Sequence, residues 1–459
     1  MSAAVAPTPL SLVEPSQFSL AQPRTATRIA RAVTLCALLS LVFVPEYVQG
    51  NGDPAAKSVL YHDASSGLRL IDILVLMLFV VHAVALGCSR QHRRQLPARL
   101  MLPLAGFAVA ILASILYGIE RGGHNFFFDW RALALGVCLY VVYRSWIETA
   151  DDARTAILVF AAVGAVRMFI AFAMYIAGSG AVLLDLRIPL FDGPTLSTIV
   201  FAGLLAVSLS QHASGWSNRW LWTLFGAAAM FLVVLCFRRS YWAELVIGLL
   251  LLGLISGGRR LRPLLLLAFT VAVASLTLGR PFVERLSSLN FTQADSSYAE
   301  DNVDHVGDVL DAWDEVRASP VMGIGLGRSY PTWRIRDWKE ESVMVHNAPL
   351  HVWLKYGLLG LLFYLVFHLS LFGCLREQAA HAPPAHQLVV RAILAYLAAQ
   401  FIVSLGFTPW PYSAMQSTNL IAFLLAVAFV QEPAWTIQPS PLSPPASTGP
   451  LISKTRFSA

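Results

Sequence analysis

Long apolar runs separated by short polar connections set the pattern of this sequence. The hydrocarbon core of a bilayer is about 30 Å thick, and a helix needs about 20 apolar residues to cross it. On that measure the chain has about twelve candidate membrane spans. They cover roughly residues 32–48, 70–88, 100–117, 129–146, 155–177, 195–210, 220–237, 242–256, 264–278, 351–374, 392–407 and 417–430. The pattern therefore predicts an all-α, polytopic membrane protein.

The composition supports a membrane protein. Of 459 residues, 56% are hydrophobic and 13% are charged, and the mean hydropathy is +0.62. A soluble globular domain usually carries about 25% charged residues. The net charge of +6 would favour nucleic acid as a partner of a soluble protein, but here the basic residues stand in short clusters between apolar runs. We interpret them as topology signals and expect membrane lipid, and no nucleic acid, around the chain.

The basic clusters predict which connections face the cytoplasm. They precede the first span and follow the second and the eighth, as Arg24, Arg28, Arg31, Arg90, Arg93, Arg94, Arg99, Arg259, Arg260 and Arg262. Under the positive-inside rule these connections face the cytoplasm, so both termini lie inside. The long polar stretch 279–350 then lies outside, in the periplasm of a Gram-negative host.

These spans divide the chain into five segments. We predict a cytoplasmic tail over 1–31, nine spans within 32–278, a large periplasmic loop over 279–350, three spans within 351–430, and a disordered cytoplasmic tail over 431–459. The expected location is the bacterial inner membrane. Five cysteines lie in or beside apolar runs without CxxC or other metal spacing, so the sequence predicts neither a metal site nor a disulfide framework.

The large loop contains one strongly patterned segment. Acidic residues recur at three- and four-residue intervals, and apolar residues recur on another face, which predicts an amphipathic helix on or near the membrane surface. The acidic set is Asp301, Asp304, Asp308, Asp311 and Glu315, and the apolar set is Val303, Val306, Leu310, Trp313 and Val316. The acidic face is open to two interpretations, a metal site and a solvated surface. We favour the solvated surface, because nothing nearby resembles a calcium or magnesium loop.

The pair Arg238 and Arg239 interrupts an apolar stretch on the outer side of the membrane. Charge at membrane depth costs about 2.5–3.5 kcal/mol per arginine. One interpretation is a tight turn whose arginines reach the lipid headgroups. We favour a clamp for an anionic group, because the guanidinium fork matches phosphate oxygens and stays charged.

A second candidate is His346-Asn347, where the large loop re-enters the membrane. Histidine has an unperturbed pKa of about 6.5, which suits proton abstraction near neutral pH. A lone histidine is more often structural, so the sequence around it decides the interpretation.

That sequence resembles the O-antigen ligase and polymerase superfamily. HNAPL at 346–350 and GLLGL at 357–361 are similar to the family's HN-x-x-L…GLxGL signature. RSYW at 239–242 resembles its SR-x-x-W segment, and a tryptophan, a proline and a glycine run within 313–327 resemble its W…P-x-x-G-x-G-x-G stretch. No strand and helix flank the glycine run as a dinucleotide site requires, so we do not interpret it as a nucleotide loop.

The chain departs from the family pattern at three positions. Arg238 stands where the family usually has serine, Pro349 where it usually has an aromatic residue, and Val309 where it often has a second arginine. A second cation that grips a diphosphate must then come from elsewhere. The local candidates are Arg238, Arg285, Arg328 and Arg187.

The resemblance implies glycosyl transfer from an undecaprenyl-diphosphate-linked glycan to an acceptor hydroxyl outside the inner membrane. A lipid diphosphate is a good leaving group that needs positive charge, and the acceptor needs one base. The resemblance thus casts Arg239 as the diphosphate ligand, His346 as the general base and Asn347 as a substrate contact. It also implies inversion at the anomeric carbon without a metal or other cofactor.

Alternatives within and beyond this class remain. A ligase would use lipid A-core as acceptor, whereas a polymerase would use a second carrier-linked glycan, and we favour the ligase. A flippase or secondary transporter would explain many spans but would show broken helices at matching places in two halves. A membrane acyltransferase is a further alternative with a single histidine.

Overall fold

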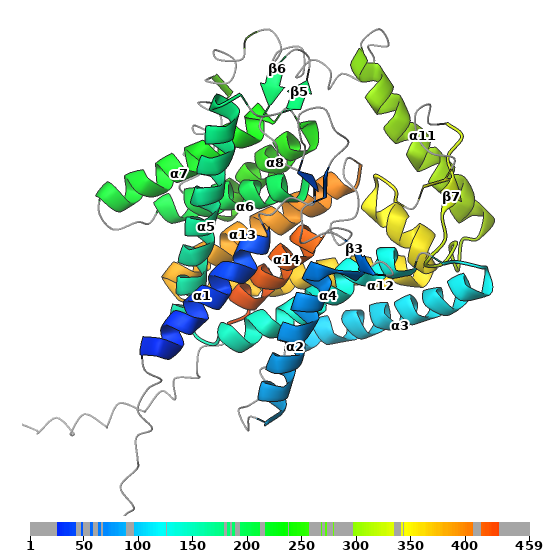
Figure 1. Ribbon diagram of the computed structural model, residues 1–459, viewed down its shortest axis with the longest axis horizontal. Coiled ribbons are helices and arrows are strands. Elements are labelled where there is room, and N and C mark those ends of the chain that lie inside the picture. The colour runs from blue at the N-terminus through cyan, green and yellow to red at the C-terminus, as the bar shows by residue number, and fades with distance from the viewer. Residues whose placement is uncertain are drawn as a thin grey trace, which may run out of the picture.

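The computed structural model describes most of the chain (Figure 1). The described residues are 25–42, 47–48, 56–57, 63–65, 68–88, 96–124, 126–178, 181–183, 186–188, 193–211, 216–236, 238–256, 268, 271–272, 279, 297–334, 341–342, 344–406 and 415–430. The predicted tail 431–459 lies outside these residues, as does most of the predicted span 264–278.

Helices dominate the described part of the chain. They are α1 (Thr25–Val42), α2 (Leu70–Cys88), α3 (Ala98–Glu120), α4 (Phe126–Trp146), α5 (Ala150–Ile176), α6 (Gly193–Ser210), α7 (Trp216–Leu235), α8 (Arg239–Ile255), α11 (Ser297–Ala318), α12 (Ala348–His381), α13 (Pro384–Ser404) and α14 (Met415–Ala428). Short strands accompany them in antiparallel pairs, as β1 (Tyr47–Val48) with β2 (Ala56–Lys57), β3 (Asp63–Ser65) with β4 (Leu68–Arg69), β5 (Ala181–Leu183) with β6 (Leu186–Ile188), and β7 (Tyr330–Pro331) with β8 (Glu341–Ser342).

The helices confirm an all-α, polytopic membrane protein. Among the described residues, six helices are long and apolar enough to cross a membrane, namely α3, α5, α6, α7, α12 and α13. Shorter apolar helices cover Val33–Val42, Leu70–Val84 and Gln416–Ala428. Every predicted span other than 264–278 overlaps a helix, so the apolar runs located these elements correctly.

The centre of the bundle is α6, which is buried on all sides from Thr195 to Ser208. A helix that is apolar all round belongs in the interior of a bundle. Aromatic rings tie it to its neighbours. Phe201 of α6 lies 5.3 Å, between ring centroids, from both Phe160 of α5 and Tyr396 of α13, and Phe160 stacks on Phe423 of α14 at 5.6 Å.

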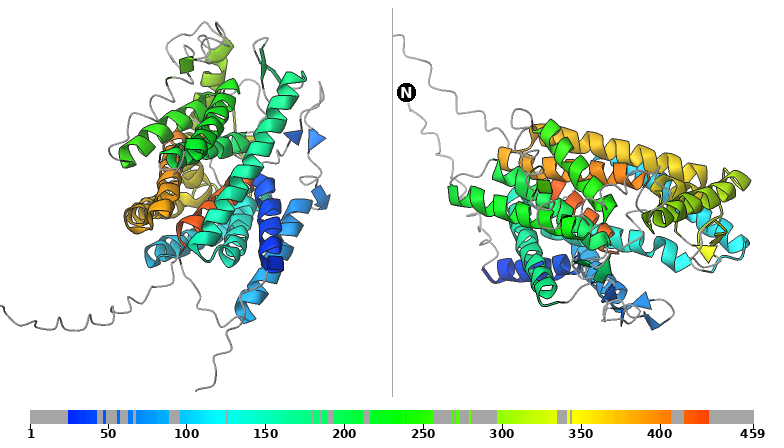
Figure 2. Two further views of the ribbon diagram at one scale, coloured as in Figure 1. Left: turned by 90° about the vertical axis from the view of Figure 1, so that its left-hand side faces the viewer. Right: turned by 90° about the horizontal axis from the view of Figure 1, so that it is seen from above.

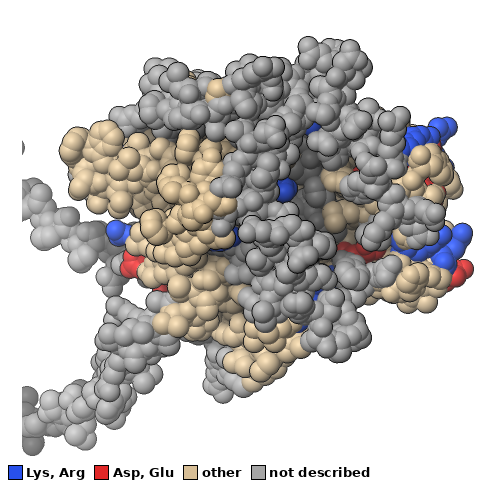
Figure 3. Space-filling model, turned by 45° about the horizontal axis from the view of Figure 1, so that its top comes forward, with Lys and Arg blue, Asp and Glu red and all other residues tan. Residues whose placement is uncertain are grey.

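The outer helices present apolar side chains outward. On α3 these are Leu102, Val109, Leu112, Leu116 and Ile119, each more than half exposed. Soluble monomers rarely expose apolar patches of this extent, so this stripe fits contact with lipid. Figure 3 agrees, since charged side chains gather mainly at the end of the molecule where α11 lies and the described surface elsewhere is largely uncharged.

Helix α11 lies at one end of the bundle, against the start of α12 (Figures 1 and 2). The predicted amphipathic helix is confirmed, but the interpretation of its acidic face as solvated is wrong for two residues. Asp308 and Asp311 are each 1% exposed, whereas Val306 and Leu310 are 54% and 46% exposed. These two carboxylates turn inward because residues that follow α11 in the chain donate hydrogen bonds to them. The side chains of Asp301 and Asp304 are not among those that the structure describes.

Candidate functional site

His346 stands immediately before α12, and the residue after it fixes where the helix begins. Asn347 is the N-cap, and its side-chain oxygen accepts a hydrogen bond from the Leu350 N–H at 2.9 Å. Its side-chain nitrogen donates to the Leu405 carbonyl just beyond α13. Asn347 therefore anchors the start of α12 to the end of α13. Pro349 fits the first turn of α12, where an amide N–H has no helical partner to lose.

Asp308 of α11 holds His346 at two points. The His346 backbone N–H donates to Asp308 Oδ2 at 2.9 Å, and the ring Nδ1 lies 3.1 Å from the same oxygen. The Tyr330 hydroxyl donates to the other oxygen of the carboxylate. The Asp308 side chain is 2% exposed and that of His346 is 20% exposed. The arrangement leaves a partly exposed imidazole on a buried acid.

The protonation states of Asp308 and Tyr330 follow from this contact. Burial alone would raise the pKa of Asp308, but hydrogen bonds from His346 and Tyr330 outweigh it and hold the pKa below its ordinary value of 3.8. Burial, and then the neighbouring Asp308 charge, raise the pKa of Tyr330 far above 10. At neutral pH the carboxylate is therefore an anion and the phenol is neutral.

Acid is expected to loosen α11 from α12. Because the folded-state pKa of Asp308 is depressed, its contact stabilises the fold above the ordinary value of 3.8 and is lost as pH falls through the lower folded value. Tryptophan fluorescence followed during acid titration in detergent measures this, since Trp313 of α11 contacts Trp353 of α12 with ring centroids 5.6 Å apart. An unchanged titration in Asp308→Asn would contradict the expectation.

The glycine run links the loop to three helices. Gly323, Gly325 and Gly327 have φ of 66°, 85° and 79°, a region that favours glycine. A Cβ at Gly323 would lie 2.2 Å from the Leu354 carbonyl oxygen, and one at Gly325 would lie 2.9 Å from the Gly118 backbone. The run is thus wedged between α12 and α3, and the Gly327 N–H donates to the Asp129 carboxylate of α4.

The first glycine of the GLLGL segment also packs against the loop that contains the glycine run. Gly357 has φ 70° and ψ −175° and breaks the helical path of α12. At the break the Leu358 N–H donates to the Val321 carbonyl at 2.9 Å. The two glycine-containing segments of the sequence motif therefore form one packing unit that supports the start of α12.

A buried ion pair lies beneath the glycine run. Lys355 Nζ is 3.0 Å from Asp129 Oδ2, and the same oxygen accepts the Gly327 N–H at 2.8 Å. Lys355 also donates to the Arg328 carbonyl, and its side chain is fully buried. Sequence reasoning missed this pair, although Lys355 is the one lysine or arginine of the apolar run between His351 and Cys374, a signal that could have identified it.

The arginine pair begins α8. Arg238 is the N-cap and is exposed, while Arg239 is the first helical residue and is partly buried. The serine that the family has at position 238 could cap the helix, whereas Arg238 makes no side-chain cap. Trp242 is structural, because its indole N–H donates to the Val233 carbonyl of α7 at 3.1 Å and so fixes the turn.

A buried polar cluster serves as a reference point for the position of Arg239 along the bundle. Ser197 of α6 donates to Glu244 of α8 at 2.7 Å and accepts from Gln400 of α13 at 3.4 Å. Arg239 precedes Glu244 by five residues, and Leu405 follows Gln400 by five. Five helical residues rise about 7.5 Å. Arg239 and Leu405 thus lie at similar distances from the same buried cluster.

Two further contacts set the helix directions. The Tyr241 hydroxyl of α8 lies 2.3 Å from where a Cβ of Gly193 would stand, so α6 and α8 begin at the same end. Ser208, near the end of α6, donates to the Leu388 carbonyl near the start of α13. The start of α8 therefore lies at the end of the bundle where α13 finishes. Because Asn347 is bonded there, Arg239 and His346 share one end of the bundle.

The remaining predicted residues are placed unevenly. Arg328 directly follows the glycine run, and its backbone carbonyl accepts a hydrogen bond from Lys355. Arg187 is in β6, with its side chain outside the description, and Arg285 lies outside the described residues. The described contacts of His346 therefore include neither Arg187 nor Arg285.

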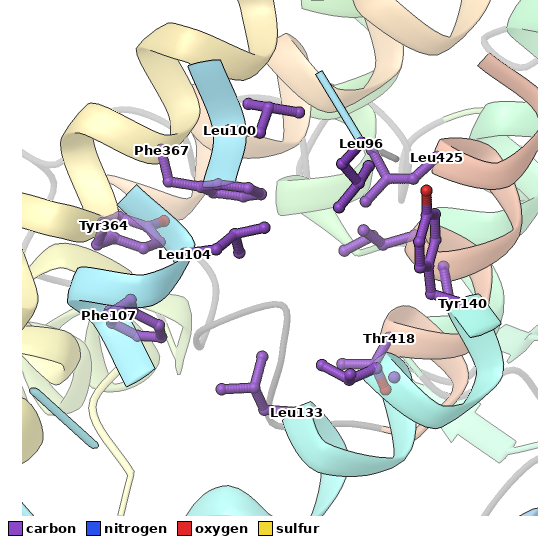
Figure 4. A pocket seen from close by; sticks show the side chains of 14 residues that line it. Leu96, Leu100, Leu104, Phe107, Leu133, Tyr140, Tyr364, Phe367, Thr418 and Leu425 are labelled. Atoms are coloured by element: carbon purple, nitrogen blue, oxygen red, sulfur yellow. The ribbon is translucent and has the colours of Figure 1, made fainter. Parts of the chain in front are cut away.

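A cavity of about 170 Å³ lies away from this polar end, between α3, α4, α12 and α14 (Figure 4). It is lined by Leu96, Leu100, Leu104, Phe107, Leu133, Gly136, Val137, Tyr140, Tyr364, Phe367, Thr418, Ile421, Ala422 and Leu425. Apolar side chains predominate there, and no charged one contributes. Its lining therefore offers neither a cation for a diphosphate nor a base for a hydroxyl.

Comparison with known proteins agrees with the motif. Residues 222–365 match the family model described as O-antigen ligase. The matched segment runs from α7 to α12 and includes Arg239, Asp308 and His346. No curated protein matches the chain.

Proposed function

Since residues 222–365 belong to the O-antigen ligase superfamily, we propose that the chain transfers a glycan from an undecaprenyl diphosphate carrier to an acceptor hydroxyl. The family match supports a membrane glycosyltransferase of the ligase or polymerase type. We propose lipid A-core as the acceptor, the bacterial inner membrane as the location and the periplasm as the side that the His346 end faces. A carrier-linked glycan as acceptor is the alternative.

The observation that carries this proposal is the shared position of a base and a cation at one end of the bundle. His346 is partly exposed and seated on an anionic carboxylate. Arg239 begins α8 at the same end, where the positive end of the helix dipole adds to its charge. A diphosphate donor and a hydroxyl acceptor need these two groups.

The proposed reaction is a single displacement. The ring nitrogen of His346 that Asp308 does not contact accepts the proton of the acceptor hydroxyl. The acceptor oxygen then bonds to the anomeric carbon while the bond from that carbon to the diphosphate oxygen breaks. The electron pair leaves with the diphosphate, whose growing charge Arg239 stabilises. Attack opposite the leaving group inverts the anomeric configuration, and the step uses no metal.

Other groups act as supports or as additional cations. Asn347 is engaged as a helix cap, so we assign it to holding His346 in place and not to the substrate itself. Lys355 forms a buried ion pair with Asp129. Arg238 and Arg328 are then the described candidates for a second phosphate contact, beside Arg187 and Arg285.

Glycan profiling of a strain that lacks the chain tests the function. We expect loss of the extended surface glycan and accumulation of carrier-linked glycan, both restored by the wild-type gene. Accumulated full-length chains indicate a ligase, and single repeats indicate a polymerase. Carrier-linked glycan trapped on the cytoplasmic face would contradict the proposal and indicate a flippase.

Arg239→Ala is expected to lower turnover by about 100- to 1000-fold, the usual effect of removing a group that stabilises developing charge. Arg239→Lys keeps the charge without the fork and is expected to retain part of the activity. Transfer assays in proteoliposomes measure both. The matched control is Arg219→Ala, because Arg219 is an exposed arginine in the first turn of α7, away from the α7–α8 turn. Equal losses at Arg219 and Arg239 would argue against a specific role.

A further inference from the structure

Asp308 does more than attach α11 to α12. Its Oδ2 accepts the His346 backbone N–H at 2.9 Å and lies 3.1 Å from the ring Nδ1. Two contacts from one residue to one oxygen fix both the position of the histidine and the rotation of its ring.

The chemistry of the contact selects one tautomer of His346. An ionised carboxylate can only accept hydrogen bonds. The ring nitrogen that faces Asp308 must therefore carry a proton, and in the neutral imidazole the lone pair is left on Nε2. A general base needs a lone pair that is aimed at its substrate.

Tyr330 stabilises the anionic form of Asp308. Its hydroxyl donates to Oδ1, the oxygen that His346 does not use. A buried carboxylate without such donors would be costly to keep ionised. The phenol comes from β7 and the acid from α11, so two separate segments of the large loop converge on one histidine.

We propose that Asp308 is a positioning residue for His346, which holds the ring in the tautomer and orientation that proton transfer requires. The inference rests on the proposed function. It also assigns a role to the inward acidic face of α11. At position 309 this chain has valine where the family often has an arginine, and the neighbouring residue acts on the base instead of on the phosphates.

The structure offers a matched control on the same helix. Asp311 is one turn further along α11 and is equally buried. Its carboxylate accepts the Arg334 N–H at 3.2 Å and pairs with the Arg334 guanidinium, whereas the carboxylate of Asp308 is the one that contacts His346. Asp311→Asn therefore perturbs the packing of α11 without touching the histidine.

The test is steady-state transfer by reconstituted full-length enzyme with a defined polyprenyl diphosphate donor. We expect Asp308→Asn to lower kcat at least tenfold, but by less than removal of the whole general base, which contributes roughly 100- to 10,000-fold. The donor KM is expected to change less than twofold. Asp311→Asn is expected to stay within threefold of wild type. In a His346→Ala background, Asp308→Asn is expected to cost nothing further, because it acts through the missing ring.

The outcomes separate this inference from the proposed function. Absence of transfer by the wild-type enzyme would overturn the proposed function. Near-normal turnover of His346→Ala would leave the proposed function standing and overturn the base role of His346, and with it the positioning role of Asp308. An inactive His346→Ala with a fully active Asp308→Asn would overturn only the positioning role, as would additive losses in the double variant. If Asp308→Asn fails to fold, ¹⁵N spectra of histidine-labelled wild-type protein, assigned by difference from His346→Gln, decide the matter: a proton on Nε2 instead of Nδ1 in the neutral ring would contradict the proposal.

Discussion

Replacing His346 with alanine is expected to lower turnover by about 100- to 10,000-fold, the range of general-base catalysis. The ring is the partly exposed titratable group at the polar end of the bundle that a buried acid orients. Its removal leaves the acceptor hydroxyl to attack without a base. The Asp308 contact to the backbone N–H of residue 346 survives the change, so the fold is expected to persist.

The measurement is glycan transfer in proteoliposomes at matched enzyme levels, with thermal unfolding as a check on folding. His381→Ala is the control, because His381 is an exposed histidine at the opposite end of the same helix. Should both variants retain normal turnover, His346 is not the base. Should both lose it equally, the effect is not specific to the site.

Lys355→Met is expected to destabilise the protein by about 3–5 kcal/mol, the cost of leaving one buried charge without its partner. Asp129 would keep its burial and the Gly327 N–H but lose the cation 3.0 Å away. The Arg328 carbonyl would lose a donor as well. Thermal unfolding in detergent measures the loss as a fall in Tm.

Two control variants test whether the loss comes from an unpaired buried charge. The double variant Lys355→Met with Asp129→Leu removes both charges and is expected to recover much of the loss. Glu377→Gln breaks the exposed pair of Arg99 with Glu377, whose side chains are 71% and 57% exposed, and is expected to cost at most about 1 kcal/mol. If Lys355→Met had an effect as small as that, the buried pair would not hold the glycine run.

The helices were predictable because their signal is local. An apolar run of sufficient length forms a helix in a bilayer whatever it packs against. The sequence could not tell which face of α11 turns inward. The spacing of Asp308 and Asp311 defines a face, but the donors that bury it, Tyr330, His346 and Arg334, come from up to 38 residues further along the chain. A periodic acidic face looks the same whether water or protein covers it.

Only those residues of the candidate site that belong to the sequence motif could be predicted. His346 and Arg239 came from the resemblance, and contacts through Asn347 and the cluster at Ser197 bring them to one end of the bundle. The supporting pairs were not predictable. Lys355 and Asp129 are 226 positions apart, and Ser197 and Glu244 are 47 apart. No periodicity links such residues, because the pairing is decided by how the helices assemble.

The bond from Asn347 to the Leu405 carbonyl has a bearing on how such a protein can diversify. It closes the ends of α12 and α13 into a ring that does not include the chain between α8 and α11. An insertion in the part of that chain that the sequence assigns to the outer loop, residues 279–296, would lengthen the loop outside this ring. Under the proposed function, the geometry around His346 and the part of the loop available to meet different glycans can therefore change independently.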